Sequence, residues 1–71
     1  MGPGIVVYAV TDEHGAYMVA EADGFMFSYK FTSATLFYDR DTAEGYCKLF
    51  NFPTEVVAFE VCRLNSEDNK N

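Results

Sequence analysis

The fold is decided by residues 5–31, IVVYAVTDEHGAYMVAEADGFMFSYKF, which read as three strands separated by two turns. Apolar and β-branched residues fill the three runs, and turn-forming residues occupy 12–15 and 23–24. Runs of this kind between turn formers are typical of consecutive β-hairpins. Glycine accepts a positive φ freely, so the Asp-Gly pair at 23–24 predicts a two-residue primed turn. The expected strands are 5–11, 16–22 and 25–31.

These turns predict a register for the strands. A four-residue first loop places Val10 opposite Tyr17, and the second turn places Met18 opposite Tyr29. Because side chains alternate along a strand, the apolar residues then divide between two faces. One face is expected to carry Ile5, Val7, Ala9, Met18, Ala20, Ala22, Phe25, Phe27, Tyr29 and Phe31. The other is expected to carry Val6, Tyr8, Val10, Tyr17, Val19 and Met26.

One helix of about ten residues is predicted to end at Phe50 or Asn51. Its apolar stripe has helical spacing: Ala43, Tyr46, Cys47 and Phe50. Asp41 is the expected N-cap, with Glu44 reaching back to its amide, and Asp39 is the competing cap. The segment 32–38 is expected to be extended, with Leu36 or Phe37 packed under the helix.

A last strand is predicted over 55–64, EVVAFEVCRL. Its alternation places Val57, Phe59 and Val61 against the helix. The reverse face then carries Val56, Ala58, Glu60 and Cys62. Crossovers between parallel strands are right-handed in nearly all proteins, so this strand is expected beside the first and parallel to it. The fold class is therefore α+β, a four-stranded sheet of order 3-2-1-4 (strand, strand, strand, helix, strand) with one helix packed on one face.

The chain of 71 residues is expected to form one domain over 5–64. Residues 1–4 read as a flexible lead or cloning scar, and 65–71 as a disordered polar tail. A domain of this size buries only about 60% of the surface that its unfolded chain exposes. Its stability is therefore expected to be marginal, and a second subunit would add buried area.

Charge and apolar pattern exclude several classes of function. Eleven acidic residues against five basic ones give a net charge of −6, which argues against direct binding to nucleic acid. No apolar run approaches the ~20 residues needed to cross a bilayer, and the first residues lack the basic start and long apolar stretch expected of a secretion signal. Cys47 and Cys62 are expected to be reduced thiols, which predicts a cytoplasmic protein.

No catalytic or metal-binding motif stands out. The two cysteines and His14 lack the spacing of a metal site, and Asp39 and Asp41 are explained by helix capping. A solvated turn at 12–15 does not shelter a substrate, and Cys47 is expected in the core. We therefore expect no cofactor, no metal and no enzymatic activity.

The second apolar face is the main functional indication, because a single helix covers only one face. The residues expected to meet another polypeptide are Val6, Tyr8, Val10, Tyr17, Val19 and Val56. The alternative is a solvated sheet on which valine and tyrosine are simply common. Two copies packed through this face would form a homodimer.

Acidic residues suggest the chemistry of the partner. Negative charge would be presented to a basic groove by Glu13, Glu21, Asp23, Asp39 and Asp41. The alternative is that the charge only keeps a small aromatic-rich protein dissolved. A different hypothesis is a carrier for a nucleotide or metabolite, held between two subunits by Tyr8 and Tyr17.

With this layout the chain resembles the small acidic accessory proteins that bacteriophages encode, which bind host enzymes or bacterial defence complexes. The likeness rests on its size, its strand-rich start, the apolar cluster at 34–37 leading through 41–44 into one helix, and the strand at 55–61. The resemblance implies an inhibitor or adaptor without catalysis, acting in the cytoplasm of a bacterial host.

Overall fold

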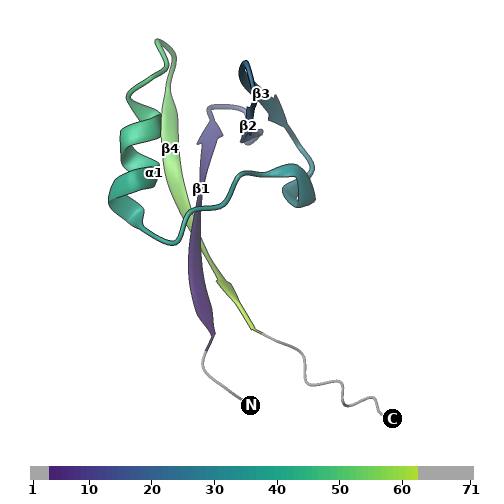
Figure 1. Ribbon diagram of the computed structural model, residues 1–71, viewed down its shortest axis with the longest axis vertical. Coiled ribbons are helices and arrows are strands. Elements are labelled where there is room, and N and C mark those ends of the chain that lie inside the picture. Colours follow the sequence, from purple (N-terminus) through teal and green to yellow (C-terminus); the bar gives the residue numbers. More distant parts are fainter. Residues whose placement is uncertain (1–3, 63–71) are drawn as a thin grey trace.

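The computed structural model describes residues 4–62 (Figure 1). The elements are β1 (Ile5–Asp12), β2 (Tyr17–Glu21), β3 (Gly24–Ser28), a 3-10 turn η1 (Phe31–Ser33), α1 (Arg40–Cys47) and β4 (Thr54–Val61). The predicted polar tail and all but the last residue of the predicted lead lie outside the described residues. No helix among the described residues is long and apolar enough to span a membrane.

The strands form one sheet of order β3-β2-β1-β4 with one helix, which confirms the predicted α+β class and strand order. The predicted parallel arrangement of the first and last strands is wrong. β4 is antiparallel to β1 along its whole length, from Thr54 opposite Asp12 to Val61 opposite Ile5. The chain passes beside the middle of β1 before α1 begins, and it then returns to the Asp12 end of β1 to start β4 (Figure 1).

The first loop is one residue shorter than predicted, because the Asp12 amide donates to the Ala16 carbonyl (3.0 Å) and leaves 13–15 as the loop. Thr11, and not Val10, lies opposite Tyr17. Asp12 shapes the loop with its own side chain: Oδ1 accepts hydrogen bonds from the amides of His14 and Ala16, each 2.9 Å long. Asp is favoured in turns because its carboxylate can bond to nearby backbone in this way.

This change of one residue exchanges the two faces of β1 relative to β2, because the side-chain period of a strand is two. Val10 shares a face with Met18, whereas the prediction placed it with Tyr17. The second turn lies at 22–23, one residue before its predicted place, and Met18 lies opposite Phe27 and not Tyr29. The register between β2 and β3 therefore changes by two residues, which leaves their relative faces as predicted.

β1 and β2 are paired only where Thr11 meets Tyr17, and the segment before the helix joins them further along. The Tyr8 and Phe37 backbones exchange two hydrogen bonds of 2.8 Å. The Thr35 amide donates to the Met18 carbonyl (3.0 Å), and the Thr35 hydroxyl accepts from the Ala20 amide (2.8 Å). In Figure 1 this segment crosses β1 on its way from η1 to α1. Residues distant in sequence thus hold the β2–β3 hairpin to β1.

The helix is capped by the competing candidate, Asp39, and not by Asp41. Asp39 Oδ2 accepts from both the amide and the hydroxyl of Thr42, each at 2.9 Å. The helix ends at Cys47, earlier than predicted, and the Thr54 hydroxyl donates to the Cys47 carbonyl (3.1 Å). Satisfying a free carbonyl at a helix end in this way stabilises the termination.

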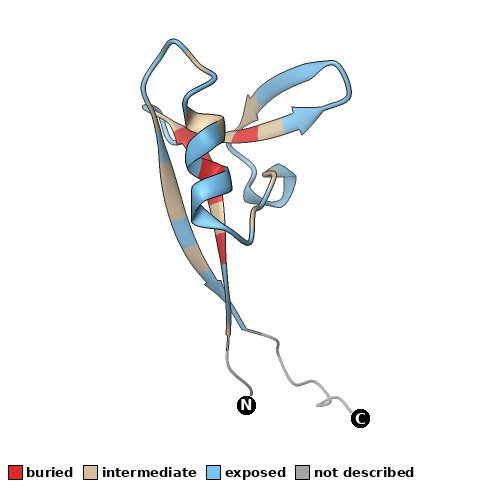
Figure 2. Ribbon diagram, turned by 60° about the vertical axis from the view of Figure 1, so that its left-hand side comes forward, coloured by how far each residue is buried: buried red, intermediate tan, exposed pale blue. Residues whose placement is uncertain are grey.

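The core lies between α1 and one face of the sheet. Val10, Met18 and Ala43 are each 0% exposed, and Figure 2 shows buried residues on β1 behind the helix. Partly buried residues around them are Tyr8, Phe27, Phe37, Tyr46, Cys47, Phe50 and Val56. Phe37 therefore packs near the helix as expected.

The predicted faces of β4 are reversed. Val56 lies opposite Val10 and packs toward the helix, whereas Phe59 lies opposite Val7 on the other side. Directly opposed residues of antiparallel strands share a face. The exchange of faces in β1 therefore also exchanges the faces of β4.

Candidate protein-interaction surface

The sheet face turned away from α1 is also apolar, and we call it the open face. Val10 and Val56 face the helix, so the residues that alternate with them, and their partners across the sheet, lie on the open face. All four strands contribute members, and η1 contributes Phe31. The open face consists of Ile5, Val7, Ala9, Tyr17, Val19, Met26, Phe31, Val57, Phe59 and Val61. The predicted second apolar face therefore exists, with different members from β1 and β4.

Three aromatic rings meet at the centre of the open face. Phe31 stands 4.7 Å from Phe59 and 5.5 Å from Tyr17 between ring centroids, both in edge-to-face geometry. Tyr17 and Phe59 are 6.2 Å apart. Such pairs add to the stability given by burial alone, because the positive ring edge faces a negative ring surface. The three rings come from β2, η1 and β4, and form one cluster.

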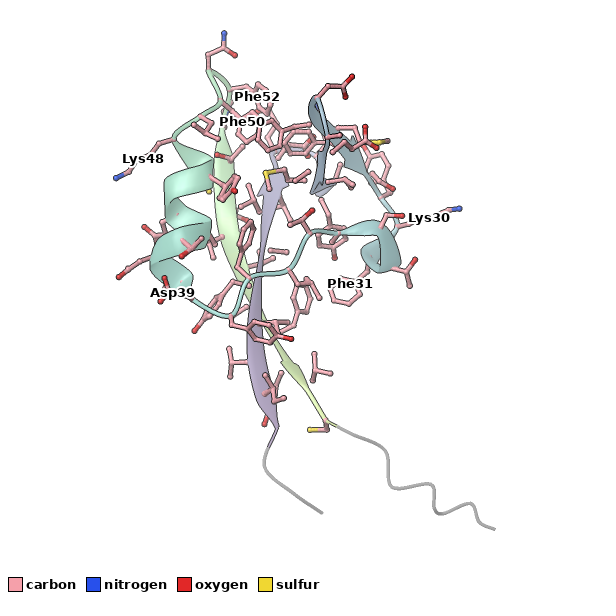
Figure 3. The ribbon with its side chains drawn as sticks, viewed as in Figure 1. Lys30, Phe31, Asp39, Lys48, Phe50 and Phe52 are labelled. Carbon is pink, nitrogen blue, oxygen red and sulfur yellow. The ribbon has the colours of Figure 1, made fainter. Side chains whose placement is uncertain are left out.

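η1 positions Phe31 against the sheet. Its turn is closed by the Ser33 amide donating to the Lys30 carbonyl and the Ala34 amide donating to the Phe31 carbonyl, each 3.0 Å long. Figure 3 shows the Phe31 ring directed toward the strands and the Lys30 side chain directed away. The prediction that Phe31 continues the third strand under the helix is wrong, since β3 ends at Ser28.

Phe31 covers only part of the open face. Val7 and Ala9, on the same face of β1, are 5% and 0% exposed, whereas the outlying members keep much of their surface. Ile5 is 56% exposed, and it lies opposite Val61, which is 46% exposed. Exposed apolar groups that adjoin a partly exposed aromatic cluster are typical of a protein-binding surface.

The six residues predicted to share the uncovered face do not share it. Tyr17 and Val19 lie on the open face. Tyr8, Val10 and Val56 belong to the helix side, where Val10 has no exposed surface with which to contact a partner. Val6 also lies on the helix side by alternation, although it is 47% exposed.

Tyr8 and Tyr17 lie on opposite faces, so they do not form the shared ligand site that the sequence suggested. The Arg40 guanidinium stands 5.7 Å from the Tyr8 ring centroid, and this cation covers the ring. Tyr17 instead contacts Phe31 and Phe59.

Neither tyrosine lines either of two open depressions on the described residues. The larger, about 550 Å³, is lined by Thr11, Asp12, Glu13, His14, Gly15, Pro53, Thr54 and Glu55. The smaller, about 380 Å³, lies between α1 and β4 and is lined by Arg40, Glu44, Cys47, Thr54, Glu55 and Val56. Within residues 4–62 no group of three or more His, Cys, Asp or Glu side chains could hold a metal ion. Cys47 and Cys62 are free thiols.

The acidic residues singled out from the sequence are all exposed, but they lie in three separate places. Glu13 is in the first turn, Glu21 and Asp23 are at the second, and Asp39 and Asp41 are at the start of α1. Alternation assigns Glu21 to the open-face side of β2. It assigns Glu55, which the sequence analysis did not single out, to the same side of β4.

A second aromatic cluster lies on the helix side. Phe25 and Phe27 contact Phe50 at 5.4 and 5.3 Å, and Phe52 lies 5.2 Å from Phe50. Phe50 and Phe52 lie at the end of the molecule beside the rings of the hairpin (Figure 3). Tyr29, predicted to join this row, is 72% exposed because β3 ends before it.

No family model, curated protein or solved structure matches the chain. The functional argument therefore stands on the geometry of the open face and on the charge around it.

Proposed function

We propose that this chain is a non-enzymatic protein-binding module, an inhibitor or adaptor that covers the surface of a partner protein with its open face. The observation that carries the proposal is the aromatic cluster of Tyr17, Phe31 and Phe59, continued by the exposed pair Ile5 and Val61. Large rigid rings surrounded by apolar groups give the binding energy typical of interface centres.

Charge supports a basic protein as the partner. The chain carries a net charge of −6, and Glu21 and Glu55 lie on the open-face side of the sheet. Acidic groups at an interface rim speed association with a positive surface and select against negative ones. A basic surface of a host enzyme or defence complex in a bacterial cytoplasm fits this chemistry, as the resemblance to phage accessory proteins implies.

A homodimer through the same face is the second form of the proposal. It is supported by the small core, in which Val10, Met18 and Ala43 form the buried cluster among the described residues. A domain of this size gains stability when a second copy buries more apolar surface. The net charge of each copy opposes this association, and salt would weaken that repulsion.

Neighbouring residues on opposite faces of β1 give a matched test. Ile5→Glu places a charge on the open face, and Val6→Glu places the same charge on the helix side at a site of similar exposure, 47% against 56%. Proteins captured from bacterial lysate by the wild type are identified, purified and titrated against all three forms.

We expect Ile5→Glu to weaken the affinity of a genuine partner at least about tenfold, because it buries an unpaired charge, while Val6→Glu changes it little. Sedimentation of the wild type and the two variants tests the homodimer in the same way: Ile5→Glu should weaken self-association, and Val6→Glu should change it little. Equal affinities for the two variants would refute docking on the open face.

A further inference from the structure

The outer edge of β4 is an unpaired strand edge. β4 runs eight residues, from Thr54 to Val61, and β1 is its partner in the sheet. Figure 2 shows it as the outermost strand on its side of the sheet. Within residues 4–62 no other strand or bridge pairs with it.

The contacts of β1 establish which peptide groups of β4 face outward. The Tyr8 amide and carbonyl both bond to Phe37, on the side of β1 away from β4. Tyr8 lies opposite Ala58, so in this antiparallel ladder they form a pair that exchanges no hydrogen bonds. The amide and carbonyl of Ala58 therefore point away from β1. By alternation the outward groups belong to Thr54, Val56, Ala58 and Glu60.

This edge lacks most of the features that usually block strand addition. Natural edge strands are protected by charged side chains (lysine above all), by proline, by bulges or by short length, and of these β4 has only the charges of Glu55 and Glu60. β4 contains neither lysine nor proline, and its pairing with β1 is continuous. The other sheet edge, β3, is only five residues long and begins with Gly24, and the free side of β1 at Tyr8 is occupied by Phe37.

We propose that the outer edge of β4 binds an extended, basic segment of the partner protein as a fifth strand. This inference rests on the proposed function and names the kind of segment that the partner offers. Both charges on β4 are acidic, Glu55 on the open-face side and Glu60 on the helix side. Opposite charges directly across two strands stabilise the pair, and like charges destabilise it. The net charge of −6 also disfavours a second copy at this edge.

The added strand would also enlarge the open face. Val57, Phe59 and Val61 lie on that side of β4, so apolar residues of the added strand opposite them would extend the apolar surface. Backbone hydrogen bonds would supply affinity, and the alternating side chains would supply selectivity, as in other cases of strand addition.

A capped fluorescent octapeptide, VKVTVTKT, serves as the probe. In antiparallel alignment its lysines lie opposite Glu60 and Glu55, and its valines lie opposite the open-face residues of β4. One control is N-methylated at its second, fourth and sixth residues, whose amides face β4. A second is N-methylated at its third, fifth and seventh, whose amides face solvent.

We expect the first N-methylated peptide to bind at least about tenfold more weakly than the second, because it loses several backbone hydrogen bonds. Replacing both lysines by glutamate should also weaken binding, and by less as salt concentration rises. Equal binding of the two N-methylated peptides, or no binding by the unmodified probe, would overturn the proposal.

Protein variants give a second, independent measurement. Ala58→Pro removes one outward amide without removing a bond to β1, and Ala58→Val keeps that amide. We expect only the proline variant to lose the probe, with the circular dichroism spectrum of both retained. A wild-type dimer that Ala58→Pro dissociates would place a second copy at this edge and overturn the proposal. Ile5→Glu lies on the open face, so its effect on the natural partner tests face docking separately from strand addition.

Discussion

Tyr8 and Phe37 are joined by two backbone hydrogen bonds of 2.8 Å, which attach the segment before the helix to the middle of β1. Beyond Tyr8, toward the start of β1, Val6 presents its amide on the same side, and within residues 4–62 nothing pairs with it there. We therefore expect the Tyr8 amide to exchange with deuterium much more slowly than the Val6 amide, because exchange requires an open hydrogen bond. Hydrogen exchange followed by NMR measures both sites in one sample, and equal rates would show that the Phe37 bridge is not formed.

Thr35→Val removes the hydroxyl that accepts a hydrogen bond from the Ala20 amide. We expect a loss of about 0.5–1.5 kcal/mol in the free energy of unfolding and faster exchange of the Ala20 amide, since this amide loses its acceptor. Thr32→Val is the control, because Thr32 is exposed. Urea denaturation and NMR exchange measure the two effects. Unchanged exchange at Ala20 would contradict the assigned bond.

Met18→Ala removes a fully buried side chain, and Met26→Ala removes one that is 46% exposed. We expect the first to lower the free energy of unfolding by about 2–5 kcal/mol, because it leaves a cavity between the sheet and α1. The second should cost far less. The expected loss for Met18→Ala is comparable with the whole stability of so small a domain, so this variant should be largely unfolded at room temperature. Denaturant titration followed by circular dichroism compares them, and similar losses would contradict the assignment of faces.

Asp39→Ala should destabilise the protein by about 0.5–2 kcal/mol, because the Thr42 amide and hydroxyl both lose their acceptor. Asp41→Ala should cost less, since Asp41 contributes only its charge to the first turn of α1. Thermal unfolding of the two variants at low and high salt separates the roles. A larger effect at Asp41 would restore the cap first expected from the sequence.

Replacing Glu21 and Glu55 by glutamine tests the acidic side of the open face. We expect slower association with a captured basic partner and a weaker dependence of the rate on ionic strength, because rim charges act mainly through the encounter rate. Asp39→Asn with Asp41→Asn changes the same number of charges at the start of α1, away from that face. Surface plasmon resonance over a range of salt concentrations compares the two double variants. If both slow association equally, only net charge matters and the location of the acids does not.

The sequence was sufficient to predict the order of the first three strands and the presence of one helix, because these depend on turn formers and on the spacing of Ala43, Tyr46 and Cys47. The last strand was correctly expected beside β1, but the parallel crossover that led to this expectation does not exist, since β4 is antiparallel to β1. The sequence was not sufficient to predict the faces of β1. Residues 5–10 are all apolar, so a slip of one residue still leaves an apolar side chain at every position. The hydrogen bonds of the Asp12 side chain decide the loop length, and hydrophobic patterning does not report on them.

The aromatic residues after β3 were misplaced for a related reason. A regular alternation of rings at 25, 27, 29 and 31 favoured one continuous strand. The chain instead leaves the sheet after Ser28, and η1 turns Phe31 toward Tyr17 and Phe59. Those partners lie in β2 and β4, so a short-range sequence pattern carries no information about that contact.

The pairing of β1 with β4 joins the two ends of the described chain, and it is the longest ladder in the sheet. Contacts of such high sequence separation form late and slow the folding of a small domain. During synthesis β1 leaves the ribosome long before its main partner, so a nascent chain that ends before Thr54 keeps one side of β1 unmatched. Folding to the native state therefore begins only after translation has passed the last strand, and the newborn chain is most vulnerable to proteases and aggregation until then.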